Sequence, residues 1–579
     1  GNMATRWGSE FKDNQWLKID LEEPRTISGL TLWWEDAYAS RYKILLSEDG
    51  STWIDVYEEK NGDGNSDEIY FRPQEARFIK IHCIKRATGW GNSLWEVKIK
   101  REDEYPVIEA SSYRGKNLPS NIMDGDVKTF WQTDEALPQW IEVDLRRKKD
   151  LGGFLIDWGE VYATDYEILT SLDKKDWRSV YGVECSNGGK DLIYIDPTRA
   201  RYIKVVCKDS NNKGVSLGEL IIKGKDEHAT PQRIYEVLAD ESPGGYFPEW
   251  IYKKQVYWTI TGVEGDEKES LISTNGTIEP DKESFTIMPY IYVDNHLVTA
   301  SDCKVSQELE EGYLPIPEVR WDYKGLILNQ KMFTHGKRGA SSTYVYYELI
   351  NNTSSSKKGS IYLTIRPIQL NPPWQHGRMP RISNIEFVSG KIDKVRINNK
   401  DDIIFLNKPD GFGATIFKAS DIISYVAGNR LPDEDYVTDV KGLASCAIRF
   451  NFDLSPASKK DIYFVLPLYQ KDIEVVKNQE EFNRALEETR DFWKAKLSAI
   501  KIDIPQKELI NVLRANLAYL LINKDNAALQ PGPRNYDRSW MRDGAVMCAA
   551  LLRGGFYKEV KDYLDWVSRL QRSNGEIPC

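Results

Sequence analysis

An internal repeat with a period of 124 residues constrains the fold of this 579-residue chain more than any other feature. The segment from Thr5, TRWGSEF with QWLKIDL after it, returns from Thr129 as TFWQTDE with QWIEVDL after it. The closing strands SLWEVKIK and SLGELIIKG match after a slip of one residue. Because a fixed period marks one structural unit per repeat, we predict a tandem duplication. Further pairs 124 apart are Trp7 and Trp131, Trp16 and Trp140, Asp20 and Asp144, Trp34 and Trp158, and Cys83 and Cys207.

Each copy has the pattern of a β-sandwich, with short alternating stretches separated by Gly, Asp, Asn and Ser. In FIKIHC and YIKVVC the apolar residues recur at every second position. This places Cys83 on the same face as Ile79, and Cys207 on the same face as Ile203. We therefore expect both thiols to be buried core groups and not nucleophiles.

Four strings carry a resemblance to a known domain family: MDGDVKTFW (123–131), the QW strands, SEDGSTW (47–53) and SLGEL. Both copies resemble the factor five/eight type C, or discoidin-like, domain, a jelly-roll module often used to bind carbohydrate. The resemblance covers residues 1 to about 225. The second copy has a segment ahead of Asp124 that the first copy lacks, so we expect the chain to start inside its first domain.

The resemblance also implies a calcium site in the second copy. In this family an Asp-Gly-Asp…Thr loop and a Glu on the last strand commonly hold the ion; the matching residues are Asp124, Asp126, Thr129 and Glu219. A hard cation takes six to eight oxygen ligands, which a tight loop can supply. The alternative is a plain turn beside a surface glutamate. In the first copy only Thr5 and Glu96 remain, and the ion there is undecided.

Glycan binding by such modules depends on aromatic side chains in the end loops and not on the sandwich itself. The loop RATGWGNS (86–93) offers Trp90 among glycines, whereas the matching loop KDSNNKGVS has no aromatic residue. Trp90 could instead pack on a neighbouring domain. We expect the first copy to bind glycan and the second to act mainly as a spacer.

The middle of the chain, residues 227–475, is predicted to form one large antiparallel β-sandwich. Stretches such as STYVYYELI alternate there with turn signals such as KPDG. In NPPWQHGRMP (371–380), Pro372 and Pro373 exclude a central strand and place Trp374 and His376 on a loop. His376 is expected to be structural, with a smaller chance of lining a sugar cleft.

Helical patterns begin after the predicted sandwich. We assign 476–505 to a helical linker and 506–579 to the first helices of an α/α toroid. The first toroid helix, 507–521, carries Leu509, Leu513, Leu517 and Leu520 on one side. The second, Ala545–Leu552, is expected to be almost wholly buried, and the third, 557–571, to be amphipathic.

The loop RNYDRSWMRDGA (534–545) is similar to one in glycosidases built on a six-hairpin toroid, the glucoamylase-like group. By that resemblance Arg542 and Asp543 grip the sugar ring at the cleavage subsite, and Tyr536 and Trp540 shape it. Aromatic surfaces with a few fixed polar groups suit a sugar, because its ring faces are apolar and its rim carries hydroxyls. The alternative is an ion pair at a helix start, with Trp540 in the core.

Hydrolysis of a glycosidic bond requires two carboxyl groups. In the toroid architecture these groups lie on later loops, so no catalytic residue is assigned. We expect the chain to end early in its catalytic domain, as a truncated, cleaved or partial product. The domains are therefore predicted as 1–103 and 104–226 (discoidin-like), 227–475 (sandwich), 476–505 (linker) and 506–579 (toroid start).

Composition narrows the partners. The net charge of −10 argues against nucleic acid and anionic membranes, and no apolar run is long enough to span a bilayer. The leading hypothesis is a modular glycoside hydrolase that takes a carbohydrate substrate, with calcium as its cofactor. The alternatives are a polysaccharide lyase, which would favour acidic sugars and a basic cleft, and a non-catalytic glycan-binding protein. The resemblance implies a secreted, periplasmic or cell-surface location.

Overall fold

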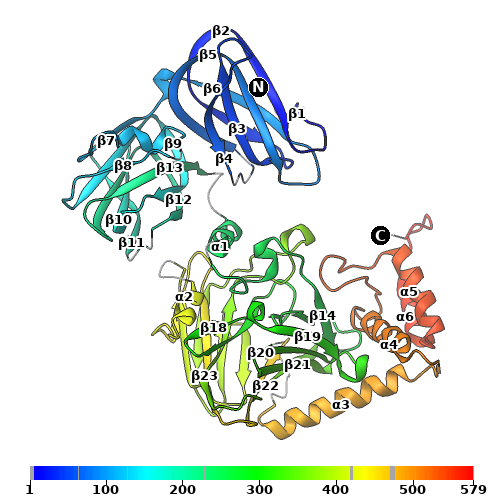
Figure 1. The fold of residues 1–579 in the computed structure, drawn as a ribbon. Coiled ribbons are helices and arrows are strands. Elements are labelled where there is room, and N and C mark those ends of the chain that lie inside the picture. Colours follow the sequence, from blue (N-terminus) through cyan, green and yellow to red (C-terminus); the bar gives the residue numbers. More distant parts are fainter. Residues whose placement is uncertain are drawn as a thin grey trace. The chain divides into compact units, whose positions relative to one another are not determined.

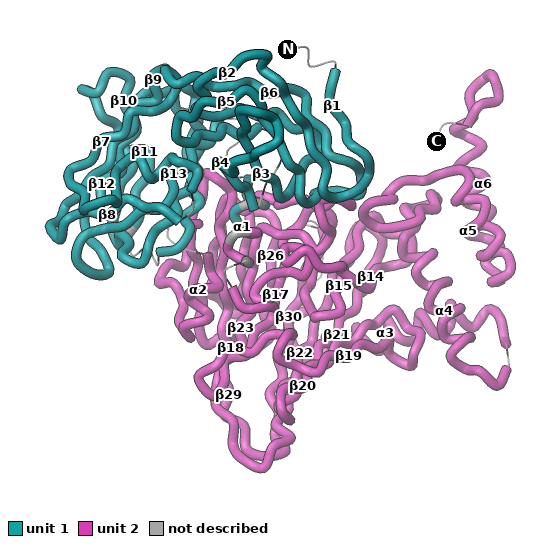
Figure 2. The backbone as a smooth tube through the Cα atoms, turned by 45° about the horizontal axis from the view of Figure 1, so that its top comes forward, with its two compact units in different colours: residues 1–234 teal, residues 235–579 magenta. Residues whose placement is uncertain are grey.

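The computed structural model describes every residue except 1–4, 61, 63, 65, 127, 185, 187, 226–229, 241, 418–420, 470–475, 503 and 578–579. The chain divides into two compact units, residues 1–234 and 235–579 (Figures 1 and 2). It is a multidomain protein built mostly from antiparallel sheets. Within the described ranges, no helix combines the length and the apolarity needed to cross a membrane.

The first half of unit 1 is a six-stranded sheet in the order β1-β6-β2-β5-β3-β4. Its strands are β1 (Trp7–Gly8), β2 (Gln15–Trp34), β3 (Ala39–Ser47), β4 (Ile54–Glu59), β5 (Ser66–Arg86) and β6 (Ser93–Arg101).

The second half of unit 1 repeats this sheet in the order β8-β13-β9-β12-β10-β11, with β7 added beside β9. The long strands β2 and β9 are both 20 residues long, and β5 and β12 are both 21 residues long. Each pair starts 124 residues apart, so the predicted duplication is confirmed. The strands are β7 (Val107–Ala110), β8 (Trp131–Gln132), β9 (Gln139–Trp158), β10 (Ala163–Ser171), β11 (Arg178–Glu184), β12 (Lys190–Ser210) and β13 (Ser216–Gly224).

Both modules bury the same polar network. Asp67 accepts hydrogen bonds from Trp34 Nε1 at 2.7 Å and from the Tyr42 hydroxyl at 2.6 Å. One period later, Asp191 accepts the equivalent bonds from Trp158 and Tyr166 at 2.7 and 2.6 Å. Around these networks the alternating strands bury their apolar faces, and both predicted core thiols, Cys83 and Cys207, are fully buried.

Unit 2 contains an eight-stranded and a nine-stranded sheet that share one apolar core. The first has the order β14-β15-β16-β17-β23-β29-β27, with β18 beside β17. Its strands are β14 (Trp258–Gly262), β15 (Glu269–Ser273), β16 (Ile278–Glu279), β17 (Thr286–Val293), β18 (His296–Val298), β23 (Lys357–Arg366), β27 (Gly411–Thr415) and β29 (Ser445–Leu454).

The second sheet of unit 2 has the order β19-β20-β21-β22-β30-β26-β25-β24-β28. Its strands are β19 (Lys304–Leu309), β20 (Pro317–Tyr323), β21 (Leu326–Lys337), β22 (Ala340–Asn351), β24 (Asn384–Val388), β25 (Asp393–Ile397), β26 (Asp401–Phe405), β28 (Tyr436–Thr438) and β30 (Lys459–Pro467). The segment with the two prolines forms no strand but a short 3₁₀ turn, Pro373–Gln375.

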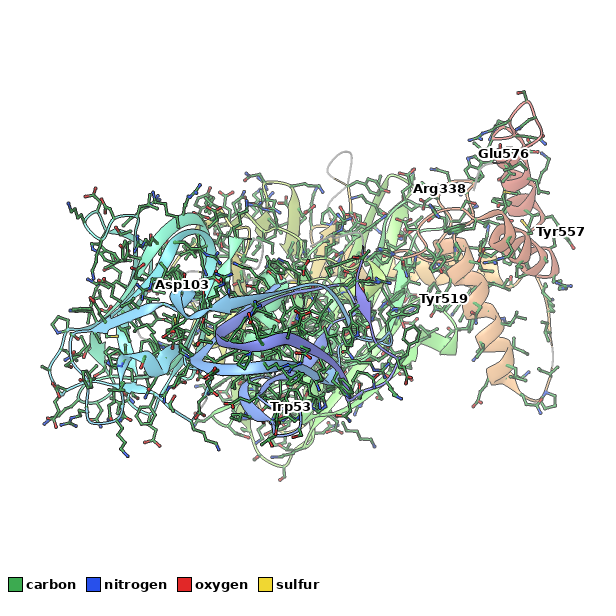
Figure 3. All side chains as sticks on the ribbon, turned by 90° about the horizontal axis from the view of Figure 1, so that it is seen from above. Trp53, Asp103, Arg338, Tyr519, Tyr557 and Glu576 are labelled. Atoms are coloured by element: carbon green, nitrogen blue, oxygen red, sulfur yellow. The ribbon has the colours of Figure 1, made fainter. Side chains whose placement is uncertain are left out.

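The described helices are α1 (Pro231–Asp240), α2 (Ile422–Ala427), α3 (Gln479–Leu497), α4 (Lys507–Ile522), α5 (Met541–Arg553) and α6 (Tyr557–Ser568). The last three follow the sandwich, and Figure 3 marks Tyr519 on α4 and Tyr557 at the start of α6. The domain boundaries given above stay predictions.

One expectation about helix burial, that for α5, was wrong, and the burial of α4 differs from the row of leucines noted in the sequence. On α4 the buried face contains Ile510, Leu517 and Leu521, whereas Leu509 and Leu513 are exposed. On α5 the buried face is Met547, Cys548 and Leu551, but Val546 and Leu552 are exposed, so the helix is not almost wholly buried. The reason is that α5 packs against α4 and α6 through one face only.

Candidate functional site

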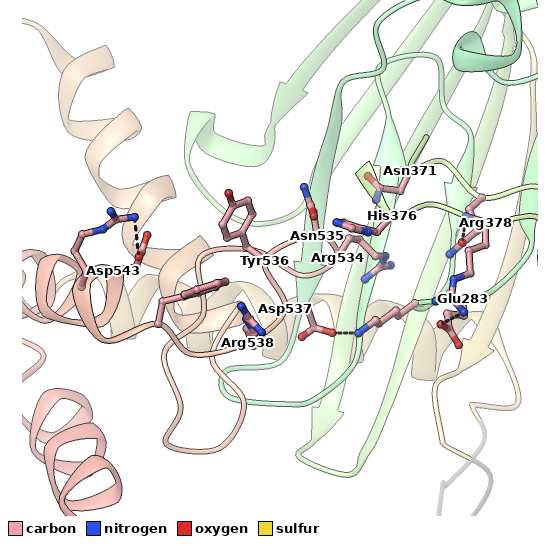
Figure 4. A pocket seen from close by; sticks show the side chains of 14 residues that line it. Glu283, Asn371, His376, Arg378, Arg534, Asn535, Tyr536, Asp537, Arg538 and Asp543 are labelled. Carbon is pink, nitrogen blue, oxygen red and sulfur yellow. Dashed lines mark hydrogen bonds and ion pairs between the residues drawn. The ribbon is translucent and has the colours of Figure 1, made fainter. Parts of the chain in front are cut away.

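A cavity of about 690 Å³ in unit 2 lies at the start of α5 (Figure 4). The structure brings together there all four residues that the sequence predicted for sugar contact, Tyr536, Trp540, Arg542 and Asp543. His376 also lines the cavity, whereas Trp374 is exposed and rests edge-on against Trp250. That Tyr536, Trp540, Arg542 and Asp543 bind a sugar stays a prediction. The other lining residues are Lys282, Glu283, Gln369, Asn371, Arg378, Arg534, Asn535, Asp537 and Arg538.

One buried carboxylate holds both walls of this cavity. Glu279, at the end of β16, is fully buried and accepts a hydrogen bond from Arg534 Nε at 2.7 Å. Its second oxygen accepts from the backbone N–H of Leu370 at 2.6 Å, in the segment that leads to His376. Arg534 is itself buried and also donates to the carbonyl oxygen of Glu269 at 3.0 Å. The two loops that line the cavity therefore share one anchor in the sandwich.

The acid next to this anchor is held neutral. Burial raises the pKa of the Glu269 side chain to about 9, and Arg534 acts in the opposite direction with a smaller effect. Burial also raises the pKa of Glu279, but Arg534 and the backbone N–H of Leu370 bond directly to that carboxylate and act against burial, so Glu279 and not Glu269 is the acid that pairs with Arg534.

The start of α5 is fixed by close packing against α6. A side chain at Gly544 would collide with the Tyr563 hydroxyl, which lies only 1.9 Å from the position of a Cβ atom. The glycine of the RDGA string therefore allows the N-terminus of α5 to approach α6. This contact holds Asp543 in the first helical turn, where the helix dipole favours a carboxylate.

The aromatic residues of the loop form a small cluster with a guanidinium group. Tyr536 and Trp540 have ring centroids 6.2 Å apart, and the Arg538 guanidinium lies 3.7 Å from the centroid of the Trp540 ring. Tyr536 is more than half exposed and Trp540 is half-buried. Trp540 is therefore not a core residue, which the alternative interpretation required.

The ion pair at the helix start is weak. Arg542 and Asp543 lie 3.6 Å apart, and the side chain of Arg542 is 91% exposed. An exposed pair of this kind contributes about 0–1 kcal/mol to stability. The two residues face the cavity, so their pairing does not explain the local fold and leaves both available to a ligand.

The predicted calcium residues lie on one loop and its neighbouring strand. The Thr129 hydroxyl donates to Asp124 at 2.9 Å, and the N–H of Asp126 donates to the same carboxylate at 2.9 Å. Arg72, from the first module, also donates to Asp124 at 2.8 Å. Glu219 Oε1 is buried without a hydrogen-bond partner. Burial first, and then the neighbouring Asp124, raises the pKa of Glu219 to about 9.

The described residues contain no formed metal centre. In those parts of the chain, no group of three or more His, Cys, Asp or Glu side chains is placed to hold an ion. The calcium site therefore stays a prediction, with Glu219 as its unsatisfied donor.

Trp90 is presented to solvent on a braced loop. It is 65% exposed, and its ring meets Phe11 edge-on with centroids 5.7 Å apart. Arg86 donates to the carbonyl oxygens of Gly89 and Trp90 at 3.1 Å and is held by Asp13. One period later, Phe11 and Trp90 are replaced by Glu135 and Gly214. The aromatic pair is thus specific to the first module.

Comparison with known proteins identifies the modules. Residues 1–97 and 107–220 match the F5/8 type C domain family. The chain contains two such domains. Their strand order and the repeat agree with this match.

Several known proteins are similar to part of this chain. A polysaccharide lyase 8 family protein, HylA, from Enterococcus faecalis is 30% identical over 125 residues, or 21% of this chain and 8% of its own. A rat discoidin, CUB and LCCL domain-containing protein 2 is 30% identical over 109 residues, or 16% of this chain and 13% of its own. A chitosan-binding module from a Paenibacillus chitosanase/glucanase is 30% identical over 20% of this chain and 94% of its own, with a TM-score of 0.20. The chain spans only a small part of the first two proteins.

Apart from His376, sequence reasoning missed the sandwich wall of the cavity. Glu279 and Lys282 contact Arg534 and Asp537 across 255 residues of sequence in each case. The one signal was Glu279 itself, an acidic residue next to Ile278 in the stretch TNGTIEP.

We predict that Arg534→Gln destabilises unit 2, because the substitution leaves Glu279 buried without its charged partner. Breaking a buried ion pair by removing one partner costs about 3–5 kcal/mol. Arg542→Gln, at the exposed position eight residues on, should change stability by less than about 0.5 kcal/mol. Urea unfolding followed by Trp fluorescence measures both. Equal effects of the two substitutions would contradict the anchoring role of Arg534.

Proposed function

We propose that this chain belongs to a modular carbohydrate-active enzyme of the glycoside hydrolase class. In this proposal the first F5/8 type C domain binds glycan, and the cavity at the start of α5 grips a sugar ring. The observation that carries the proposal is the convergence of Tyr536, Trp540, Arg542 and Asp543 on one cavity. These residues were inferred from the loop string alone, and a cavity lined by aromatic and polar side chains is what sugar recognition requires.

The helices after the sandwich support the toroid assignment. Helices α4, α5 and α6 follow the sandwich and the α3 linker in the order expected for the six-hairpin group. They carry apolar residues on both faces, with Leu513, Val546 and Leu564 exposed. Helices of a toroid pack on two sides, so this pattern suits that fold. The catalytic carboxyl groups are not assigned, and an extracellular or surface location is part of the proposal.

In the proposed site, Asp543 accepts hydrogen bonds from two ring hydroxyls and Arg542 donates to others. A carboxylate can accept from two donors and a guanidinium presents a rigid fork, so together they fix the orientation of one ring. The exposed ring of Tyr536 and the half-buried ring of Trp540 would meet its apolar face. Positioning of this kind is worth most in the transition state of the reaction.

We expect Asp543→Ala to reduce binding of a responsive oligosaccharide by about ten- to a hundredfold while leaving the melting temperature unchanged. A charged hydrogen-bond partner is worth about 1.5–3 kcal/mol. The ligand is chosen from an array of neutral and acidic oligosaccharides, and calorimetric titration of the full chain measures the affinity. The matched control is Asp565→Ala, an exposed acid on α6. A lower melting temperature with unchanged binding would show that Asp543 is structural.

A second experiment separates the module from the cavity. Trp90→Ala should abolish retention of the chain on an immobilised glycan that the first module recognises, because a stacked aromatic ring supplies much of the contact with a sugar. Tyr113 is also an exposed aromatic residue but lies in the second module, so Tyr113→Ala should leave retention intact. Full retention of the Trp90→Ala variant would remove Trp90 from the proposal.

Calcium in the second module is the remaining part of the proposal. The buried, unpartnered Glu219 oxygen and the neighbouring Asp124, Asp126 and Thr129 oxygens fit a hard cation in their chemistry. The ion would neutralise carboxylates that otherwise repel one another. Arg72 already contacts Asp124, so it would compete for that carboxylate.

We predict that millimolar calcium raises the melting temperature of the module transition relative to a sample with chelator. A ligand present at 100 times its Kd stabilises the folded state by about 2.7 kcal/mol. Glu219→Gln should remove this shift, and Arg72→Gln should enlarge it. Differential scanning calorimetry of the full chain provides the measurement. Identical traces for the wild-type chain with and without calcium would exclude the site.

A further inference from the structure

The charges that line the cavity do not balance, although the chain as a whole is acidic. The lining contains five Lys or Arg side chains but only three carboxylates. Lys282 pairs with Asp537, Arg378 lies 3.3 Å from Glu283, and Arg542 lies 3.6 Å from Asp543. The charge of Arg534 is neutralised by Glu279, which is buried in the sandwich and does not line the cavity. This leaves one cation, Arg538, without a carboxylate partner among the described residues.

Arg538 is arranged as a receptor for an anion. Its guanidinium lies over the Trp540 ring, 3.7 Å from the ring centroid, and this contact restrains the group. The side chain is exposed, and among the described residues its guanidinium has no hydrogen-bond acceptor, whereas its backbone N–H donates to the carbonyl oxygen of Tyr536. A restrained guanidinium, whose donors lie in one plane, matches the two oxygens of a carboxylate.

Two further features favour an anion at this place. The α5 helix starts at the cavity without a side-chain cap at Trp540, so its N-terminal N–H groups add positive potential. The pairs of Arg378 with Glu283 and of Arg542 with Asp543 are exposed and contribute little, so their cations can be redirected to a ligand at small cost. Figure 4 shows Arg538 beside Asp537, on the loop that faces the sandwich wall.

We propose that the cavity selects a glycan that carries carboxylates, a hexuronate, and that Arg538 is the residue that recognises the carboxylate. This inference rests on the proposed function, in which the same cavity grips a sugar ring through Asp543. The aromatic residues contact the face of the sugar ring, and Asp543 accepts hydrogen bonds from its hydroxyl groups. Arg538 distinguishes the carboxylate of a hexuronate from the hydroxymethyl group of a neutral hexose. A bidentate contact of this kind favours the acidic sugar, because the hydroxymethyl group of the neutral analogue offers the guanidinium neither a charge nor a second oxygen.

The test compares oligosaccharides that differ only at this group. Matched pairs of β-1,4-linked tetrasaccharides, glucuronate against glucose and mannuronate against mannose, are titrated into the full chain by calorimetry. We expect the acidic member of at least one pair to bind about ten- to a hundredfold more tightly. Higher ionic strength should weaken only that member. Arg538→Gln should remove the preference without changing the melting temperature, and Arg538→Lys should retain part of it.

Matched variants separate this inference from the proposed function. Arg553→Gln, at the far end of the same helix, should leave both affinities unchanged. Binding of the neutral member alone, lost in Asp543→Ala, would overturn the choice of an acidic glycan and leave sugar contact standing. Acidic binding that Arg538→Gln leaves intact would overturn the role of Arg538. If no member binds in a way that depends on Asp543, both proposals fall.

Discussion

The cavity at the start of α5 depends on one buried ion pair, between Glu279 and Arg534. The carboxylate lies under two loops and binds one through a guanidinium and the other through the backbone N–H of Leu370. A buried charge is costly unless it is paired and its remaining lone pairs are satisfied, and here both conditions hold. The same pair thus fixes the distance between the sandwich wall and the loop that carries Tyr536 and Asp543. Neutral Glu269 beside it prevents a second carboxylate from competing for Arg534.

The fold of the modules follows from the sequence because a repeat reports long-range structure directly. The period of 124 residues seen in the sequence returns in the strands of both sheets. The paired networks around Asp67 and Asp191 show why Trp34 and Trp158 recur. The loop string at the start of α5 likewise predicted four side chains that the structure brings to one cavity. The alternation of apolar residues and short sequence strings are sufficient to predict a structure where residues close in sequence are also close in space.

The sequence could not predict which helix residues are buried or which distant residues meet at the cavity, and the reasons are physical. Apolar residues occur on both faces of α4, so periodicity alone could not say that Ile510 and Leu517 would be buried and Leu509 exposed. The sandwich wall of the cavity comes from positions 255 residues away from their partners, and a lone Glu in a strand carries no sign of what it will pair with. The burial of Glu219 without a hydrogen-bond partner was also invisible, because a glutamate on a last strand can face either side.

The net charge of a chain does not predict the charge of a cavity within it. A net charge of −10 describes the whole chain and gave no sign of a basic cleft. The field inside a cavity is set by the groups that line it, since charges beyond a Debye length of about 10 Å are screened. Here three exposed or partly exposed pairs cancel within the lining, and a buried carboxylate cancels Arg534 from outside it. What remains is the guanidinium of Arg538 over the Trp540 ring, beside a helix start that has no side-chain cap. Composition therefore bounds the partners of the surface as a whole, but the charge inside the cavity is set by a handful of side chains drawn from three segments of the chain.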